Sequence, residues 1–426
     1  MIDTKKLTLC LAAAAAALLV LPHSAIHAAG APIACDPDNG GLTLPPGFCA
    51  LVVANDLGEA RHAVVAPNGD LYVALMNGGA VALHDSKGNG RFDVIEKFGE
   101  GSTTGIALHD GYLWLAHRNS IERYKMTAGQ LKPAGPPEVV ASGLQGQPEH
   151  GDKGIVFDGK GSFYINIGAP SNACQVRNRQ KGSPGQDPCP LLEQHGGIWK
   201  FSDHKLGQTQ ADGVRYATGM RQMPAIAWHD GYLYIVMNSR DQLDYLYPDK
   251  FTAEENATRP AEPMYRVDEP GDNFGWPYCF FDYPSQKLLL QPEYGGDGKI
   301  VGRCSQYKLP IASFPAHWAP VDAMFYTGAQ FPAHYRNGMF IAFHGSWNRA
   351  PLAQEVSNVT FQPFAGKNPS GKFEIFASGF AGKERIMNPN DALARADGVA
   401  QAPDGSLYIT ESQKGKVWRV FYRGGK

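Results

Sequence analysis

The feature that most constrains the fold of this chain is a strand–turn–strand pattern that recurs six times. Each copy is a run of alternating apolar and polar residues, a turn built on Asp-Gly, Asn-Gly or an equivalent pair, and a second alternating run, which is typical of a β-hairpin. A third strand is visible after two copies, at 121–126 and 416–422. The copies begin at Arg61, Thr104, Lys153, Met223, Val321 and Ala396.

Six such hairpins predict an all-β protein, a six-bladed β-propeller. One blade cannot bury both faces of its small sheet, so neighbouring blades have to supply the core. The copies are unevenly spaced, and residues 240–320 hold a long insertion. Long loops on one face of a rigid propeller usually build the binding site. We therefore expect this insertion to belong to a set of long loops on the active-site face. A sandwich of Greek keys is the competing fold.

Composition narrows the possible partners. Of the 426 residues 43% are hydrophobic and 19% are charged, and the formal net charge is −2. A chain with so little net charge offers no basic surface to a polyanion, so we expect no nucleic-acid partner.

The first residues predict export. Residues 1–29 combine a charged start, an apolar stretch and a small-residue exit, which is the pattern of a cleavable signal peptide. A retained membrane anchor is the alternative, but the apolar run is short for a span. We therefore expect a periplasmic or secreted protein without a membrane span after cleavage, in which residues 30–426 form a single propeller domain.

The cysteines agree with an oxidising compartment. Once Cys10 leaves with the signal, six cysteines remain in three local pairs within loop-like sequence, and proximity predicts three short-range disulfides. Sequence alone permits other connectivities. The pairs that proximity favours are Cys35–Cys49, Cys174–Cys189 and Cys279–Cys304.

Polar residues stand just before the first strand of several copies. Equivalent positions of successive blades converge around the central channel of a propeller, so we expect these side chains to face a common pocket. For an arginine there, a salt bridge between blades is the alternative to anion binding. For a histidine, the alternative is an ordinary loop residue bonded to the backbone. The residues are Arg61, His62, His150, Arg221, Gln222 and Arg395.

Four strings carry a more specific signal. "MFIAFHGSWNRAP", "ATGMRQMPAIAWHDGYLY", "GDNFGWPYC" and "ADGVAQAPDGSLYITESQKGKVWRV" resemble the glucose/sorbosone dehydrogenase family, within it the sorbosone dehydrogenase-like branch. The likeness runs from about residue 42 to the C-terminus. It implies a six-bladed propeller that binds pyrroloquinoline quinone (PQQ) with Ca²⁺ in the central pocket and oxidises sugars or related aldehydes and alcohols.

The resemblance also implies roles for single residues. His150 matches the family's base, which takes a proton from the substrate hydroxyl, and imidazole titrates in the right range for this. Arg221 matches the arginine that stabilises the reduced quinone, and Gln222 stands beside it at the cofactor. Arg395 matches an arginine that pairs with a PQQ carboxylate.

Further positions follow from the same resemblance. Arg240 and Asp241 fall in the loop that helps to hold the cofactor's calcium through its carbonyl oxygens. The string His-Gly-Ser-Trp-Asn-Arg supplies candidates for the cofactor wall, and a packed blade corner is its alternative reading. These wall candidates are His344, Trp347, Asn348 and Arg349.

The chain departs from the glucose-oxidising pattern at three positions. Ala169 stands where that branch has the aspartate that orients the catalytic histidine, and without a carboxylate the imidazolium is stabilised less. Asp397 replaces a second arginine, and Gln222 replaces an asparagine. These changes argue against glucose as the substrate and leave the base in place.

The sequence therefore predicts a PQQ-dependent dehydrogenase of a sugar, a sugar aldehyde or a related alcohol, which passes its electrons to an external acceptor such as a cytochrome or a small quinone. Two other classes stay open. A calcium-dependent hydrolase of the lactonase kind would use Asn166, Asn238 and Asp241. A binding propeller without catalysis would hold a glycan or a protein through the aromatic loop "WPYCFFDYP".

Overall fold

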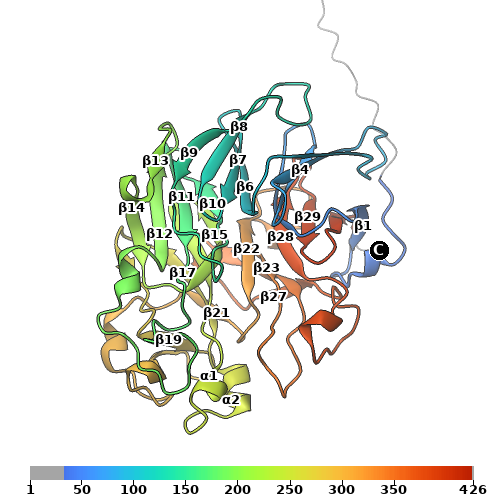
Figure 1. Ribbon diagram of the computed structural model, residues 1–426. Helices are drawn as coiled ribbons and strands as arrows, with labels where there is room; N and C mark the ends of the chain where they lie inside the picture. The colour runs from blue at the N-terminus through green and yellow to red at the C-terminus, as the bar shows by residue number, and fades with distance from the viewer. Residues whose placement is uncertain (1–32, 425–426) are drawn as a thin grey trace, which may run out of the picture. The chain divides into compact units, whose positions relative to one another are not determined.

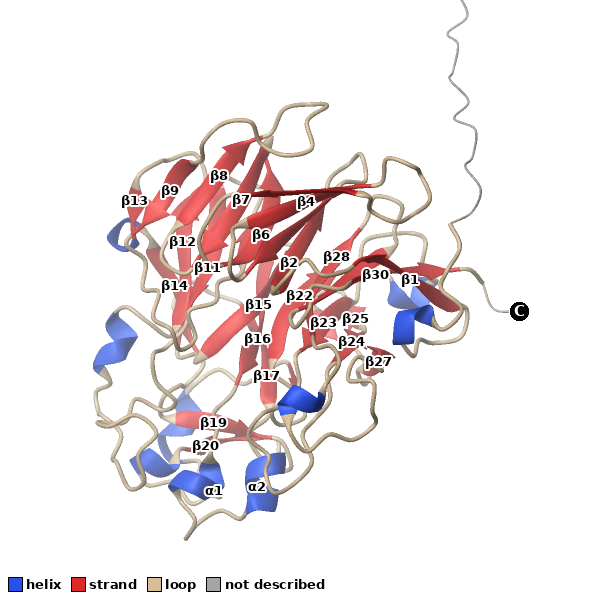
Figure 2. Ribbon diagram, turned by 45° about the vertical axis from the view of Figure 1, so that its right-hand side comes forward, coloured by secondary structure: helices blue, strands red, loops and turns tan. Residues whose placement is uncertain are grey.

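Six mainly antiparallel sheets of four or five strands form the blades of the computed structural model, which describes residues 33–424. The predicted all-β, six-bladed β-propeller is confirmed, and the two short α-helices of the described residues lie outside the blades. Both are drawn beside the β19 hairpin at one end of the molecule in Figures 1 and 2. They are α1 (Leu243–Leu246) and α2 (Ala253–Thr258).

The strands follow one another from blade to blade, innermost strand first. Blade 1 contains β2 (Ala60–Val65), β3 (Leu71–Leu75), β4 (Ala80–His84) and β5 (Val94–Phe98). Blade 2 contains β6 (Thr103–His109), β7 (Tyr112–His117), β8 (Ile121–Lys125), β9 (Glu138–Ser142) and β13 (Gln208–Thr209). Blade 3 contains β10 (Ile155–Phe157), β11 (Ser162–Ile167), β12 (Gly197–Ser202), β14 (Val214–Thr218) and β18 (Asp272–Asn273).

The second half of the ring has the same order. Blade 4 contains β15 (Gln222–His229), β16 (Tyr232–Asn238), β17 (Glu262–Val267) and β21 (Ala312–Phe314). Blade 5 contains β22 (Pro320–Phe325), β23 (Met339–Phe343), β24 (Asn358–Gln362) and β27 (Glu374–Ala377). Blade 6 contains β28 (Ala396–Gln401), β29 (Leu407–Glu411), β30 (Val417–Tyr422) and β1 (Phe48–Ala54).

The remaining elements are short. Two hairpins lie outside the blades: β19 (Cys279–Asp282) with β20 (Lys287–Leu290), and β25 (Phe364–Ala365) with β26 (Asn368–Pro369). The 3₁₀ turns are Asn39–Gly41, Pro190–Glu193, Gln210–Asp212, Pro292–Tyr294, Gly302–Gln306, Ala333–Tyr335 and Pro389–Asp391.

The six innermost strands form a closed ring. Strand β2 contacts β6, β6 contacts β10, β10 contacts β15, β15 contacts β22, β22 contacts β28, and β28 returns to β2. All six begin at the copies recognised in the sequence, so the first hairpin of every blade was predicted correctly. The starts of these strands therefore meet around one central channel.

The sixth blade joins the two ends of the described chain in one sheet. Strand β1, from the beginning of the described chain, pairs antiparallel with the last strand β30, with Phe48 opposite Tyr422 and Ala50 opposite Val420. In Figure 1 the blue β1 accordingly lies beside the red strands of the C-terminal blade. The last blade is thus built from both ends of the described chain, a pairing the hairpin pattern does not predict.

Aromatic and branched side chains fill the space between the blades. Between blades 2 and 3, Trp114 packs against Phe163, whose ring stacks on Phe201 at 5.3 Å between centroids. Strands such as β3, β23 and β29 are buried along their whole length because a blade covers each face. This mutual burial keeps the ring rigid, and a rigid ring can hold loop residues at fixed positions around the channel.

The pairing of the innermost strands is irregular at their starts. In five of the six blades the register shifts near the first residue pair of the inner hairpin, for example between Gln222 and Ala225 in β15 and between Ala396 and Gly398 in β28. An extra residue at such a place bends the strand and redirects its side chains. The irregularities lie at the mouth of the channel.

The long insertion packs as one unit with a loop of blade 3. The three disulfides are the predicted ones, Cys35–Cys49, Cys174–Cys189 and Cys279–Cys304, and the last two join a single apolar cluster. Trp276, Tyr278 and Phe281 are buried in that cluster. The aromatic loop "WPYCFFDYP" is therefore a cover over this cluster, which removes the basis for a binding propeller that uses it.

The predicted signal peptide, residues 1–29, lies outside the described residues. Within residues 33–424 there is no helix with the length and apolarity that a membrane crossing requires.

Candidate active site

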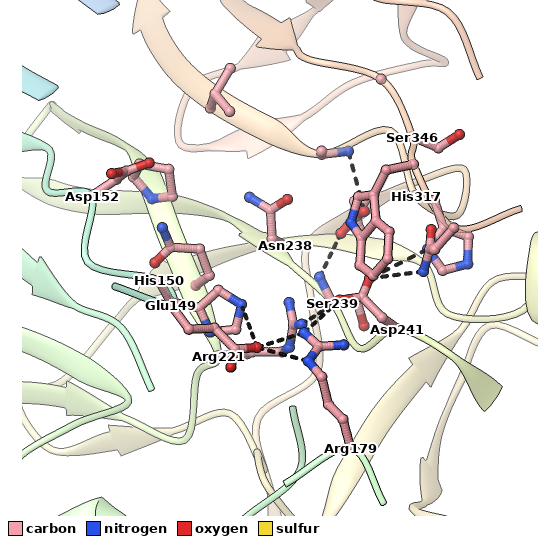
Figure 3. Close-up of a pocket in the computed structure, with 18 residues that line it drawn as sticks. Glu149, His150, Asp152, Arg179, Arg221, Asn238, Ser239, Asp241, His317 and Ser346 are labelled. Carbon is pink, nitrogen blue, oxygen red and sulfur yellow. Dashed lines mark hydrogen bonds and ion pairs between the residues drawn. The ribbon is translucent and has the colours of Figure 1, made fainter. Parts of the chain in front are cut away.

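A pocket of about 230 Å³ opens at the starts of the innermost strands. Loops from blades 3, 4 and 5 build its walls, and Figure 3 shows most of its side chains pointing to one centre. The residues that line it are Glu149, His150, Asp152, Arg179, Arg221, Gln222, Pro224, Asn238, Ser239, Asp241, Glu262, His317, Ala319, Val321, Gly345, Ser346, Trp347 and Asn348.

His150 lies in this pocket in a fixed orientation. Its Nδ1 lies 2.6 Å from the carbonyl oxygen of Ala169. A carbonyl can only accept, so Nδ1 carries the proton and Nε2 is the basic nitrogen. Burial and the neighbouring Arg221 lower the pKa of His150 well below its ordinary value. The imidazole is therefore neutral near pH 7 and able to accept a proton at Nε2.

The backbone around His150 is built for close contact. His150 has a φ of +62°, and its carbonyl oxygen lies 2.3 Å from the point where a Cβ on Gly168 would stand. Only glycine fits at position 168. The next residue, Ala169, donates its N–H to the carbonyl oxygen of Arg221 at 2.8 Å and accepts from His150 through its own carbonyl. Ala169 thus links the histidine to the arginine.

The sequence interpretation of Ala169 rested on its side chain, and the structure shows what its backbone does. Position 169 lacks a carboxylate, as noted, yet its carbonyl oxygen occupies Nδ1 of His150. A carbonyl fixes the tautomer as a carboxylate would, but it adds no negative charge to stabilise the protonated imidazole.

Arg221 is held by a buried carboxylate. Its side chain is 3% exposed, and its Nη2 donates to Oδ2 of Asp241 at 2.6 Å. Asp241 also accepts from Arg179 at 3.1 Å and from the Nδ2 of Asn348 at 3.0 Å. Burial opposes the ionisation of Asp241, but Arg221 and Arg179 together outweigh it and hold the pKa of Asp241 well below its usual range.

An ion-pair chain extends from Asp241 to the loop of the histidine. The guanidinium of Arg179 bridges Asp241 and Glu149, with its Nη2 2.6 Å from Oε1 of Glu149. That same Oε1 lies 3.8 Å from Nε2 of His150. The half-exposed indole of Trp347 stands over Arg179 at 5.9 Å. The chain Glu149–Arg179–Asp241–Arg221 therefore lines the pocket, partly covered by an aromatic ring.

A second buried acid lies deeper in the pocket wall. Glu262 accepts the N–H groups of Ser239 at 2.7 Å and Ala319 at 3.3 Å. Burial raises the pKa of Glu262 to about 8, so this carboxyl is mostly protonated at neutral pH.

Two amide oxygens of the lining have no hydrogen-bond partner. They are Oε1 of Gln222 and Oδ1 of Asn348, and both are buried. The Nε of Arg221 is also buried without a partner. Buried polar atoms are normally satisfied, so these three atoms indicate positions where a bound molecule or ion would make contacts.

Six of the ten residues that the resemblance assigns to the site line the pocket: His150, Arg221, Gln222, Asp241, Trp347 and Asn348. The other four lie outside its lining. Arg240 is fully buried and pairs with Glu293 at 2.7 Å. Its neighbour Asp241 has its carbonyl oxygen taken by Nδ2 of Asn172. The loop therefore offers few free oxygen atoms to a calcium ion.

The remaining three support the wall from behind. Arg395 donates through Nε and Nη2 to the carbonyl oxygens of His344 and Gly345, so two of its donors already hold the loop that carries Trp347. Nε2 of His344 contacts the hydroxyl of Ser412 at 2.8 Å, and Arg349 pairs with Glu355. Arg61 in turn pairs with Asp397 at 2.6 Å, so it forms the salt bridge between blades that was the alternative to anion binding.

Sequence reasoning missed several lining residues, mainly Glu149, Arg179, Glu262 and His317. Glu149 directly precedes His150 and could have been found from that adjacency. Arg179 lies inside the loop closed by Cys174 and Cys189, and nothing in its local sequence indicates that this loop folds over the channel.

Of the three candidates for a calcium-dependent hydrolase, Asn238 and Asp241 line the pocket and Asn166 does not. Asn166 is consumed within its own blade, where it accepts from the N–H of Gly154 and donates to the carbonyl of Asp152. The carboxylate of Asp241 is occupied by two arginines. Only Asn238 of that set lines the pocket without these constraints.

Comparison with known proteins extends over the whole propeller. A family described as TrAA12-like matches residues 42–423. A pyrroloquinoline quinone-dependent pyranose dehydrogenase of Coprinopsis cinerea is 23% identical over 294 residues, 61% of this chain and 37% of that protein. An uncharacterized protein of Borreliella burgdorferi is 28% identical over 164 residues, 38% of this chain and 39% of that protein. The matches thus span less than two fifths of either curated relative.

Solved structures agree with the fold. The holo form of the PQQ domain of the Coprinopsis cinerea pyranose dehydrogenase has a TM-score of 0.70 at 17% identity, over 89% of this chain and 97% of that chain. A calcium structure of a Trichoderma reesei family AA12 enzyme has a TM-score of 0.70 at 15% identity, over 90% and 97%. The apo form of the soluble aldose sugar dehydrogenase of Escherichia coli has a TM-score of 0.58 at 16% identity, over 88% and 100%.

The predicted likeness to PQQ sugar dehydrogenases is confirmed at the level of family and fold, and the sorbosone branch stays a prediction. The family match begins before β1, ends after β30 and takes in every loop that lines the pocket. Since it covers nearly the whole described chain, this protein belongs to the TrAA12-like family.

Proposed function

We propose that this chain is a quinoprotein dehydrogenase that oxidises a sugar, a sorbosone-like sugar aldehyde or a related alcohol with PQQ and Ca²⁺. The observation that carries the proposal is the neutral His150, whose basic Nε2 is fixed in the channel pocket beside the buried Arg221. The names of the relatives, PQQ-dependent pyranose dehydrogenase and aldose sugar dehydrogenase, support the substrate class.

The residues of the pocket fit such a cofactor. PQQ is a flat molecule with three carboxylates, and Arg179 and Arg221 supply guanidiniums for an anion, including a buried Nε of Arg221 that has no other partner. Ca²⁺ takes oxygen ligands, and the unpartnered amide oxygens of Gln222 and Asn348 are of that kind. When bound, PQQ would supply the quinone that accepts the hydride of the substrate carbon, and with it the two electrons of the oxidation.

The chain's own residues would handle the proton. Nε2 of His150 accepts the proton of the substrate hydroxyl, and the Ala169 carbonyl keeps Nδ1 protonated so that Nε2 stays available. Arg221 and Arg179 disfavour the resulting imidazolium, and Asp241 offsets part of that repulsion. Trp347 offers an aromatic face against which a sugar ring can pack.

The rest of the prediction belongs to the same proposal. Residues 1–29 would direct the chain to the periplasm or the exterior, and residues 30–426 would act there as one domain. Three disulfides agree with an oxidising compartment. An external cytochrome or quinone would take up the electrons.

The experiment is reconstitution of the metal-free protein with PQQ and Ca²⁺, followed by reduction of an artificial dye with a panel of aldoses, sugar aldehydes and alcohols. His150→Gln should lower kcat by about 100-fold or more. His229→Gln is the matched control, because His229 is similarly buried (15% against 13% exposed) and lies at the far end of an inner strand. Unchanged quinone absorbance on adding PQQ, or equal kcat in both variants, would refute the proposal.

A further inference from the structure

A second group of potential ligands lies at the other end of the innermost strands. We define the interblade cluster as His109, Asp110, Asp203 and His204. The first two lie at the turn that follows the inner strand β6, and the last two follow directly after β12. The cluster therefore joins blade 2 to blade 3. The pocket of the proposed dehydrogenase lies where the inner strands begin, so the cluster is separate from it.

The distances within the interblade cluster suit a small divalent cation. Nε2 of His109 lies 2.9 Å from Oδ2 of Asp203 and 3.5 Å from Oδ2 of Asp110, and Nε2 of His204 lies 3.2 Å from Oδ1 of Asp203. Ligands about 2.0–2.1 Å from a tetrahedral zinc ion are roughly 3.3 Å from one another. The ligand atoms of His109, Asp110 and Asp203 lie within 4.8 Å of one another, and a rotation of the exposed His204 from Oδ1 of Asp203 toward them would complete the coordination.

One oxygen of the interblade cluster has no hydrogen bond. The side chain of Asp203 is 2% exposed; His109 contacts its Oδ2, whereas no hydrogen bond reaches Oδ1. Leaving a buried carboxylate oxygen unsatisfied costs free energy. The ring of His204 already lies over this oxygen, 72% exposed and free to turn. A cation between the two would satisfy the oxygen that the protein leaves unpaired.

The nearest positive side chain does not use that carboxylate. Arg123 gives its Nε to Glu138 and one Nη to the backbone carbonyl of Asp203, and its guanidinium packs on Tyr112. Arg123 thus holds the backbone of Asp203 in place. Both carboxylate oxygens of Asp203 remain directed to the histidines.

A repeat within the chain shows which feature of the interblade cluster serves packing and which is particular to the cluster. The sequence His-Asp-Gly-Tyr occurs at 109–112 and again at 229–232. His109 stacks on Phe157 and His229 stacks on Phe325, both at 4.0 Å between centroids. Stacking between blades therefore accounts for the histidine in both copies. Among the residues that the structure describes, only the copy at His109 gathers a third acid or histidine ligand within reach.

We infer that the interblade cluster is a binding site for one Zn²⁺ ion, which would fasten blade 2 to blade 3. Two imidazole nitrogens and two carboxylates form a ligand set that favours zinc over calcium, because calcium prefers oxygen ligands alone. The two inner ligands, His109 and Asp203, are nearly buried, and the two outer ones, Asp110 and His204, close over the ion from the solvent side.

The test uses the full protein without PQQ, freed of metal by a chelator and titrated with Zn²⁺ in a calorimeter, with metal content measured after dialysis. The wild type should retain one Zn²⁺ per chain, and Co²⁺ should give the visible absorption of a tetrahedral site. His204→Ala, at an exposed position, should weaken binding at least about tenfold, and Asp203→Asn should weaken it more. His229→Gln, in the second copy of the motif, should bind as the wild type does.

Absence of binding at micromolar Zn²⁺, or equal affinity in wild type and His204→Ala, would overturn the inference. Because His204→Ala is on the surface and should fold normally, a lost site cannot be mistaken for misfolding. The result does not depend on the proposed dehydrogenase activity, since sugar oxidation should be the same in wild type and His204→Ala.

Discussion

Replacing Asp241 with asparagine tests whether the ion-pair chain of the pocket is held together by that one carboxylate. Asparagine keeps the volume and removes the charge, so the buried Arg221 loses the anion 2.6 Å from its Nη2. Breaking a buried ion pair by removing one partner costs about 3–5 kcal/mol, because the remaining charge stays desolvated. Glu149 also acts on Arg221 electrostatically, so we expect the lower end, about 3 kcal/mol.

The dependence on pH gives this prediction a second signature. The pKa of Asp241 is lowered in the folded protein relative to its ordinary value of 3.8. On acidification the unfolded chain therefore takes up this proton first. The stability contributed by Asp241 is fully present above about pH 5 and is lost as the pH falls through and below 4. The difference in unfolding free energy between wild type and Asp241→Asn should accordingly shrink toward low pH.

The assay is urea unfolding at pH 7 and at a series of pH values down to 3, which crosses the ordinary pKa of 3.8. The matched control is Asp404→Asn, which removes an acid that pairs with Arg419 at 2.8 Å on the surface, where the carboxylate is 46% exposed. An exposed pair contributes about 0–1 kcal/mol. If Asp241→Asn loses no more than Asp404→Asn at pH 7, or if its deficit does not change with pH, the reasoning is refuted.

Three further predictions follow from the pocket. Gly168→Ala would bring a Cβ to 2.3 Å from the His150 carbonyl oxygen and 2.5 Å from Oε1 of Gln222, so kcat should fall because the histidine is displaced. Gly135→Ala, where a Cβ would meet no atom within 4 Å, should leave kcat unchanged in the dye assay. Glu262 has its pKa raised from 4.5 to about 8, so the folded state holds a proton that the unfolded state releases. Wild-type stability relative to Glu262→Gln should therefore fall by up to about 1.4 kcal/mol per pH unit between those values in urea titrations, and a flat difference would contradict the burial argument. Arg395→Gln removes the donors that hold the carbonyl oxygens of His344 and Gly345, so the Trp347 loop should loosen and KM for the sugar should rise more than kcat falls; equal KM would contradict this role.

The fold was readable from the sequence because its unit is local. An alternating hairpin with a glycine turn carries its pattern within about fifteen residues, and six repetitions leave few architectures that bury every sheet. The outer strands are harder to predict, since blade 3 borrows β18 from the insertion and blade 2 borrows β13 from a loop of blade 3. Pairings of this kind depend on contacts between distant segments.

The site was only partly readable, for a different reason. Residue type and position at the start of a copy were enough to predict that His150 and Arg221 share one pocket, because the starts of the inner strands meet around the channel. The same reasoning selected Arg395, whose guanidinium turns toward carbonyl oxygens. The resemblance selected Arg240, whose guanidinium turns toward Glu293. Side-chain direction depends on the neighbours of the folded chain. The contribution of Ala169 was invisible because it comes from a backbone carbonyl, which every residue has.

The pairing of β1 with β30 has a consequence for how the protein matures. The sixth sheet cannot form until residues near 422 have been synthesised, so the ring stays open throughout translation and its apolar edges stay exposed until the end. Deleting the β1 segment should then leave the sixth blade with three strands and an unpaired β30 edge, a species expected to aggregate.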